Sequence, residues 1–230
     1  MKNEILIKKL NDFIKKYKAE NTLFYMFWKS LGETDDFYII GGAIRSIYNN
    51  NKPRDLDIIV KSGMKGILER LSGVSMYRNY YGGYKIDLNG LIVDIWDFES
   101  HWAFKKGILP ADEKHLTESC FFDFDALVYS PVTNYLNIDR YLHAIESRTI
   151  DFIKNDTDYI ECNPGNLTNV VRAIVAAIDF DLTFSTSVTT YIKSFLIKND
   201  FDSLKKCEYR HYKEDKISFE HYNRILQTVI

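Results

Sequence analysis

The chain has 230 residues, of which 46% are hydrophobic and 27% charged, a balance typical of a globular protein rather than a disordered or fibrous one. Lys and Arg number 30 against 32 Asp and Glu, and the net charge of −2 argues against a protein that coats nucleic acid, although it allows a local basic face. No run approaches the roughly 18 to 20 apolar residues of a membrane span. Three scattered cysteines are typical of a reducing compartment. We therefore expect a cytoplasmic protein with no membrane partner.

The start of the chain has the apolar spacing of an amphipathic helix. Leu6, Leu10, Phe13 and Tyr17 recur at helical intervals, with lysines mostly between them. The segment lacks the apolar core and small-residue cleavage site of a secretory signal. We expect residues 1–24 to form a helix docked on the body of the protein, and a helix lying on a membrane surface is the less favoured alternative.

The pattern changes near residue 138. From Phe37 to Asn137, short β-rich runs are separated by turn residues, and from Ile138 onward helical patterns dominate. This order predicts an α+β fold. We expect a mixed β-sheet domain over residues 25–137, followed by a helical domain over residues 138–230.

Two turn signals organise the predicted sheet. Asn89-Gly90 joins the runs YKIDL and LIVDIW and predicts an antiparallel hairpin, because both positions of such a turn require positive φ. Gly41-Gly42 follows the run FYII and precedes the helical run AIRSIYNN. A strand that turns through two glycines into a helix presents backbone N–H groups at the helix N-terminus, where an anion such as phosphate is favoured.

Asp55 and Asp57 alternate with Leu56 at the start of a strand. Alternation places both carboxylates on one face, about 7 Å apart along the chain. They repel each other unless a cation lies between them, and Mg²⁺ favours carboxylate and phosphate oxygens. A lone Asp-x-Asp is usually a solvated strand end, but the glycine pair upstream favours a site for metal and phosphate.

Asp94 lies within the apolar run LIVDIW, on the return strand of the hairpin. An acidic residue there is costly unless it is paired or metal-bound, so Asp94 is the candidate third carboxylate. An Asp on the solvated face of the strand is an equally favoured alternative. Asp97 has the opposite strand parity and Asp87 lies near the turn, which makes both weaker candidates.

Three motifs carry a resemblance to a known family. GGAIRS, RDLDI and VDIW resemble the head domain of the class II poly(A) polymerase and tRNA nucleotidyltransferase (CCA-adding) family, within the polymerase beta-like nucleotidyltransferase superfamily. FFDFDALVYSP is similar to the stretch between that family's head and neck, and NLTNVVRAIVAAIDF to its first neck helix. The resemblance covers roughly residues 37–195 and suggests a minimal, stand-alone bacterial member.

The resemblance implies an enzyme that transfers an NMP from an NTP, such as ATP, to a hydroxyl with release of pyrophosphate. It implies two Mg²⁺ ions that clamp the attacking and leaving oxygens. The residues that it implies are Asp55, Asp57 and Asp94 for catalysis and metal binding, and Gly41, Gly42 and Arg45 for the nucleotide phosphates. For Arg45, a salt bridge on the helix face is an equally favoured alternative.

The sequence also departs from the family. Ser46 stands where the family has Asp, and residues 119–121 (Ser-Cys-Phe) stand where it has Arg-Arg-Asp. Asn166 and Asn169 stand where an Asp and an Arg pair with the incoming base. Asn still bonds a base edge but without charge, so the C-then-A choice is not expected. Arg172 would face the cleft from the neck helix, with a helix-surface Arg as the alternative. The body and tail that hold tRNA are not expected in this chain, so we do not carry over CCA addition.

The acceptor is open among three hypotheses. Residues 205–213, KKCEYRHYK, interleave basic and aromatic residues as an RNA surface would, which favours an RNA or tRNA 3′ end. An ordinary solvated helix is nevertheless the more favoured interpretation of that segment. The second hypothesis is transfer to a protein or small molecule, as in toxin- or resistance-type enzymes. The third is a non-catalytic nucleotide-binding module, which the missing basic run favours and the retained carboxylates disfavour.

Overall fold

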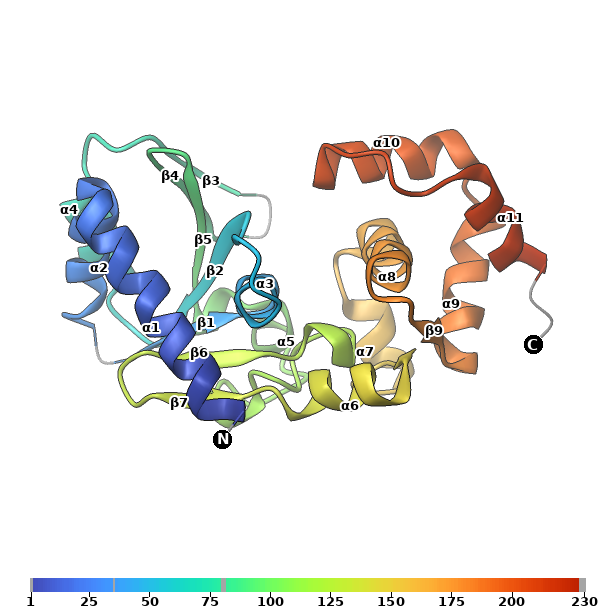
Figure 1. The fold of residues 1–230 in the computed structure, drawn as a ribbon, viewed down its shortest axis with the longest axis horizontal. Coiled ribbons are helices and arrows are strands. Elements are labelled where there is room, and N and C mark those ends of the chain that lie inside the picture. The colour runs from blue at the N-terminus through green and yellow to red at the C-terminus, as the bar shows by residue number, and fades with distance from the viewer. Residues whose placement is uncertain (1, 35, 80–81, 228–230) are drawn as a thin grey trace. The chain divides into compact units, whose positions relative to one another are not determined.

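The computed structural model describes residues 2–34, 36–79 and 82–227 (Figure 1). The chain divides into two compact units. The first comprises Met1–Ser119 and Asp125–Asp139, and the second comprises Cys120–Phe124 and Arg140–Ile230. The large sheet lies in the first unit and the longer helices after residue 139 lie in the second, so the predicted α+β class is confirmed.

The first unit is built on a seven-stranded mixed sheet. Its strands are β1 (Phe37–Ile40), β2 (Asp55–Val60), β3 (Met76–Arg78), β4 (Tyr84–Leu88), β5 (Leu91–Asp97), β6 (Val128–Ser130) and β7 (Tyr135–Asn137). They lie in the order β3-β4-β5-β2-β1-β6-β7, and only β2 and β5 pair in parallel. The predicted hairpin is confirmed, because β4 and β5 pair antiparallel across Asn89 and Gly90, which both have positive φ.

Helices at the start of the chain pack on this unit. They are α1 (Lys2–Glu20), α2 (Thr22–Leu31), α3 (Gly42–Tyr48) and α4 (Met64–Arg70). Helix α1 packs against α2 and α3, and α2 packs against α4. Leu6 and Leu10 are buried, so the N-terminal helix docks on the unit as expected, but it ends at Glu20 and α2 begins at Thr22, inside the range 1–24 expected for one helix. Asn21 begins α2 by accepting a hydrogen bond from the Phe24 N–H (3.0 Å), and it donates one to the Leu88 carbonyl (2.7 Å) at the end of β4.

The loop between β5 and β6 holds shorter elements. They are η1 (Phe98–Ser100), α5 (Trp102–Lys105), η2 (Glu113–His115) and η3 (Asp123–Asp125). Apolar side chains of this loop pack on the sheet in one buried cluster with Tyr38, Ile59 and Val128. None of these short elements was expected from the sequence, because each is too brief to show a helical period.

The second unit is mainly helical. Its elements are α6 (Asp139–Ser147), β8 (Thr149–Ile150), α7 (Thr157–Cys162), α8 (Asn166–Phe180), β9 (Thr183–Phe184), α9 (Thr186–Leu196), α10 (Phe201–Tyr212) and α11 (Phe219–Gln227). The helix expected over RYLHAIESRTIDFI ends earlier than predicted. Arg148 adopts φ +53°, a left-handed conformation that ends α6, and the next two residues pair with β9 in parallel. Among the described residues, no helix is both long and apolar enough to cross a membrane.

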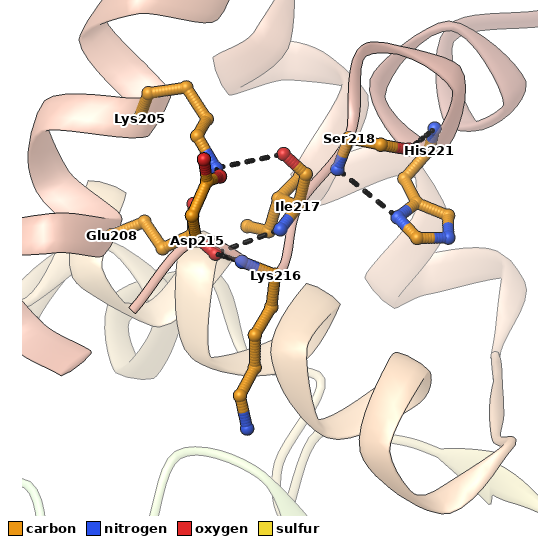
Figure 2. A network of polar contacts seen from close by, with 7 residues as sticks. All are labelled: Lys205, Glu208, Asp215, Lys216, Ile217, Ser218 and His221. Atoms are coloured by element: carbon orange, nitrogen blue, oxygen red, sulfur yellow. Dashed lines mark hydrogen bonds and ion pairs between the residues drawn. The ribbon is translucent and has the colours of Figure 1, made fainter. Parts of the chain in front are cut away.

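A buried carboxylate holds the connection between α10 and α11 (Figure 2). Glu208 has no exposed area, and it accepts hydrogen bonds from the backbone N–H groups of Lys216 (2.7 Å) and Ile217 (2.8 Å). Lys205 forms ion pairs with Glu208 and Asp215 and donates to the Ile217 carbonyl (2.9 Å). Burial lowers the pKa of Lys205, but its hydrogen bonds to the two carboxylates outweigh that effect and leave the pKa raised. The Glu208 carboxylate therefore lies inside the second unit, where Lys205 and two backbone N–H groups stabilise its charge.

His101 packs against the aromatic cluster of the β5–β6 loop. Its ring lies 5.0 Å from the ring of Phe104 and 6.2 Å from that of Trp102. Its Nδ1 atom is buried and has no hydrogen-bond partner among the described residues. Burial lowers the pKa of His101 from 6.5 to about 4. The folded protein therefore keeps this imidazole uncharged at pH values where an unfolded chain would protonate it.

This shift predicts a loss of stability in acid. Between pH 6.5 and about 4 the unfolded chain binds a proton at His101 that the folded chain does not, so the free energy of unfolding falls as the pH falls. The full shift corresponds to about 3 kcal/mol. Urea unfolding at pH 7, 5.5 and 4.5 should show a smaller acid loss in His101→Gln than in the wild type. His143→Gln, at an exposed position, is the matched control. Equal acid sensitivity in wild type and His101→Gln would contradict the prediction.

Candidate functional site

The three candidate carboxylates lie at neighbouring positions of the sheet. Asp55 and Asp57 begin β2, and Asp57 registers with Asp94 of the parallel strand β5. Residues i and i+2 of a strand share a face, and so do registered residues of adjacent strands, so all three carboxylates share one face. Asp97 registers with Val60, on the other face, and its Oδ1 accepts a hydrogen bond from the Ser100 N–H (2.7 Å). The strand parity expected from the sequence is confirmed.

The glycine turn begins directly beside this carboxylate row. Ile40, the last residue of β1, pairs with Asp57, and Gly41 follows it with φ +66° and ψ −129°. A Cβ at Gly41 would meet nothing within 4 Å, so the backbone conformation rather than crowding requires glycine there. The Gly41 N–H donates to the Leu127 carbonyl (2.8 Å). Gly42 and the residues after it are therefore the backbone donors left to consider for an anion.

Arg45 lies in an ion pair. Its Nη1 atom is 2.8 Å from Oδ1 of Asp125, and the two side chains are only 20% and 11% exposed. The salt-bridge alternative for Arg45 is thus the one observed, although its partner comes from a distant segment rather than from the same helix face. Asp125 was not a predicted site residue. Its place beside α3 depends on the packing of η3, which has no local sequence signal.

Asp94 is paired with Lys85. The two residues are registered across the β4–β5 hairpin, and the Lys85 ammonium forms an ion pair with the Asp94 carboxylate, which is 7% exposed. Sequence reasoning missed Lys85, although a signal existed. A two-residue turn at Asn89-Gly90 fixes the register of the hairpin and places residue 85 opposite residue 94.

The chemistry of these donors suits Mg²⁺, because carboxylate oxygens are the ligands that it prefers. Among the described residues, no group of three or more Asp, Glu, His or Cys side chains is placed to hold a metal ion. Asp94 is turned to Lys85, and both Nε and Nη2 of Arg54 donate to Oδ2 of Asp55 (3.0 and 2.8 Å). Metal binding at this face therefore stays a prediction, and it requires these carboxylates to exchange a cationic side chain for the ion.

The candidate base-contacting residues lie on α8 in the second unit. Asn166, its first residue, is exposed, and Arg172 is half-buried. Asn169 is 4% exposed, and its Nδ2 donates to Oδ1 of Asn163 (2.7 Å). Burial raises the pKa of Tyr191 to about 12, while a hydrogen bond between Tyr191 and Asn169 acts in the opposite direction. Asn166 thus faces solvent, whereas Asn169 is bonded inside the unit.

Residues 119–121 (Ser-Cys-Phe), which stand where the resembled family has Arg-Arg-Asp, have packing roles in this structure. Ser119 is buried, and its hydroxyl donates to the Leu116 carbonyl (2.7 Å). Phe121 is buried against the rings of Phe152 (5.2 Å) and Tyr191 (5.4 Å). The Cys120 carbonyl accepts a hydrogen bond from a buried tyrosine of α7. These residues build the core of each unit instead of presenting cations.

Comparison with known proteins bears on the fold. No family model matches the chain, and no curated protein matches it. A CCA-adding enzyme solved with ATP has a TM-score of 0.64 at 17% identity, over 96% of this chain and 53% of that one. The Thermotoga maritima CCA-adding enzyme complexed with tRNA has a TM-score of 0.61 at 17% identity, over 93% of this chain and 53% of that one. A tRNA-processing enzyme with CTP has a TM-score of 0.57 at 17% identity, over 84% and 51%. The chain therefore has the fold of about half of these proteins.

The Lys85–Asp94 pair predicts a stability effect that is separate from any activity. Lys85→Met leaves a buried carboxylate without its cation, which should cost about 1 to 3 kcal/mol in the free energy of unfolding. The double variant Lys85→Met/Asp94→Asn removes the stranded charge and should recover most of that loss. Urea unfolding of the three proteins checks this, and an unchanged midpoint in Lys85→Met would show that the pair does not stabilise the fold.

Proposed function

We propose that the protein is a nucleotidyltransferase of the polymerase beta-like superfamily, which transfers the NMP of an NTP to a hydroxyl acceptor. The carrying observation is the row of Asp55, Asp57 and Asp94 on one sheet face, directly beside the turn at Gly41. The shared fold adds support, since CCA-adding enzymes with this fold have been solved with ATP and with CTP. In the reaction, the acceptor oxygen bonds the α-phosphorus, the bond from that phosphorus to the bridging oxygen breaks, and pyrophosphate leaves.

The residues divide this task. Two Mg²⁺ ions held by Asp55, Asp57 and Asp94 would neutralise charge on the attacking and leaving oxygens. Asp57 is the neighbour of both Asp55, two residues before it on β2, and Asp94, its registered partner on β5, so it would be the carboxylate shared by both ions. Asp94 is only 7% exposed, so few water molecules would compete for its oxygens. Backbone N–H groups from Gly42 onward are the proposed donors to the β- and γ-phosphates.

The second unit supplies the proposed base contact. Asn166 is exposed at the first residue of α8, where its amide is able to bond a base edge. Asn169 is bonded within the unit and so contributes by holding Asn163 and the start of α8. Arg172, half-buried on the same helix, is the cationic residue proposed for nucleotide binding from this unit.

An RNA 3′ end, that of tRNA included, is the proposed acceptor. One solved enzyme with this fold is complexed with tRNA. Transfer to a protein or a small molecule is kept as the alternative, because the protein-wide charge gives no general preference for nucleic acid. The proposed location is cytoplasmic, which the three scattered cysteines of the sequence favour. None of the three forms a disulfide in the part of the chain that the structure describes.

The first test concerns the carboxylates. Asp57→Asn and Asp55→Asn keep side-chain size but remove a charge, so transfer should fall at least about a hundredfold while stability holds or rises slightly. Asp97→Asn is the matched control, because an Asn oxygen still accepts the Ser100 N–H, and most activity should remain. Transfer of label from an α-labelled NTP measures the activity of each variant, and urea unfolding measures its stability. Full activity in Asp57→Asn would overturn the assignment.

The acceptor is identified by the same label. Each α-labelled NTP is incubated with the protein, Mg²⁺ and total RNA, and the proposal predicts labelled RNA. Label in a protein or a small product would move the acceptor to that class. Tight NTP binding with no labelled product would contradict nucleotidyl transfer and favour a nucleotide-binding module.

Base selection should be weak. A charged bidentate contact discriminates between bases by about 1 to 3 kcal/mol, and the exposed amide of Asn166 offers only neutral bonds. Transfer rates with ATP, CTP, GTP and UTP side by side should differ by less than about a hundredfold. Asn166→Ala should compress these differences further, whereas Asn169→Ala should mainly lower stability. A preference of a hundredfold or more for CTP and ATP would contradict this account.

A further inference from the structure

A polar pocket of about 450 Å³ lies in the second unit, where the start of α8 meets α10. Residues 164–168 form one wall, and Ser203, Lys206, Cys207 and Arg210 form the other. The two walls touch where the Thr168 hydroxyl lies 3.7 Å from Sγ of Cys207. The pocket is built entirely from the second unit, and its lining includes Asn166, which is exposed.

One face of α10 forms the second wall. Its four lining residues are spaced three, one and three residues apart, which puts them on one side of a helix. The opposite side is buried through Leu204 and Glu208. Figure 2 shows how Glu208 and Lys205 turn toward the segment after α10, where the ion pair between them neutralises both charges. Helix α10 therefore keeps Glu208 inside the unit, whereas Lys206 and Arg210 are exposed on the pocket wall and Asp202 is exposed outside the pocket lining.

The pocket lining carries two positive charges and no carboxylate. Lys206 and Arg210 are both exposed, and neither forms an ion pair within the part of the chain that the structure describes. The acid that Lys206 influences is Asp200, whose pKa is lowered mainly by hydrogen bonds from Ser203 and only slightly by this lysine. Since the whole chain has a charge of −2, the positive pocket is a local feature rather than part of a generally basic surface.

We infer that this pocket binds two successive backbone phosphates of the polynucleotide acceptor, with Lys206 and Arg210 as the cationic contacts. The inference rests on the proposed function and specifies how the acceptor is held. Hydroxyl groups of Thr168 and Ser203 add hydrogen bonds to phosphate oxygens. An NTP triphosphate is accompanied by Mg²⁺, and this lining has no carboxylate to share such an ion. Singly charged phosphodiesters, one per nucleotide, match two cations on successive helical turns.

Binding of an unreactive strand tests the inference without any transfer. The full chain is titrated, without NTP or Mg²⁺, into a fluorescent single-stranded RNA of about twelve nucleotides whose 3′ end is deoxy. Lys206→Gln/Arg210→Gln should weaken binding about tenfold at 0.1 M salt. The slope of log affinity against log salt should shrink by about 1.4, since each phosphate contact on a single strand contributes about 0.7. Gln keeps good helix propensity, so α10 should remain folded.

The control removes the same charge elsewhere in the second unit. Lys213→Gln/Arg224→Gln changes two exposed cations outside the pocket and should leave affinity and slope nearly unchanged. An equal loss in both double variants, or no loss in Lys206→Gln/Arg210→Gln, would overturn the inference. Loss of ATP binding with unchanged RNA binding would assign the pocket to the nucleotide instead and would also overturn it. Asp57→Asn should bind the RNA normally, so a failure of the proposed chemistry is distinguishable from a failure of this pocket.

Discussion

The parallel pairing of β2 with β5 sets two carboxylates, Asp57 and Asp94, side by side in register. Like charges on neighbouring strands repel, and burial strengthens that repulsion because there is less water to screen it. A fold keeps such a pair only if cations offset it. In this structure Lys85 neutralises Asp94 and Arg54 neutralises Asp55. The central strands of the first unit therefore form a face that is stable only when positive charge is supplied to it.

The same rule governs two other buried carboxylates. Asp125 meets Arg45 beside α3, and Glu208 meets Lys205 beside α11. The two ion pairs connect different parts of the fold. The Arg45 pair joins α3 to the segment before β6, and the Lys205 pair fixes the connection after α10. The face around Asp57 brings three carboxylates to neighbouring positions of adjacent strands, and that concentration makes it the candidate reaction site.

Much of this arrangement follows from local sequence rules. Strand alternation is sufficient to put Asp55 and Asp57 on one face and Asp97 on the other, and the Asn89-Gly90 turn is sufficient to pair β4 with β5. The neck-like helix NLTNVVRAIVAAIDF forms with the predicted bounds because its apolar period is long and unbroken. The register between β2 and β5 was not available from those rules. It joins strands that are distant in sequence, so no turn specifies it.

Physical causes also explain the features that the sequence did not predict correctly. The resemblance implied that Asn169 contacts a base, but the structure buries its side chain inside the second unit. The position of a residue in a helix shows which way its side chain points only once the packing of that helix is known. The Arg45–Asp125 pair depends on a short 3₁₀ turn without a periodic pattern. The pocket between α8 and α10 forms because the face of α10 that carries Glu208 is buried, which leaves Lys206 and Arg210 on the pocket side. The sequence composition does not reveal such a local positive patch, because the net charge of the whole chain is only −2.

The carboxylate face of the first unit is proposed to take up divalent cations together with a nucleotide. The most direct measurement is a titration with Mn²⁺, used as a paramagnetic substitute for Mg²⁺, followed by electron paramagnetic resonance with a non-hydrolysable NTP analogue present. The account predicts two bound ions per chain with the analogue, and a loss of that binding in Asp57→Asn but not in Asp97→Asn. Mn²⁺ binding that is absent, or that Asp57→Asn leaves unchanged, would contradict it.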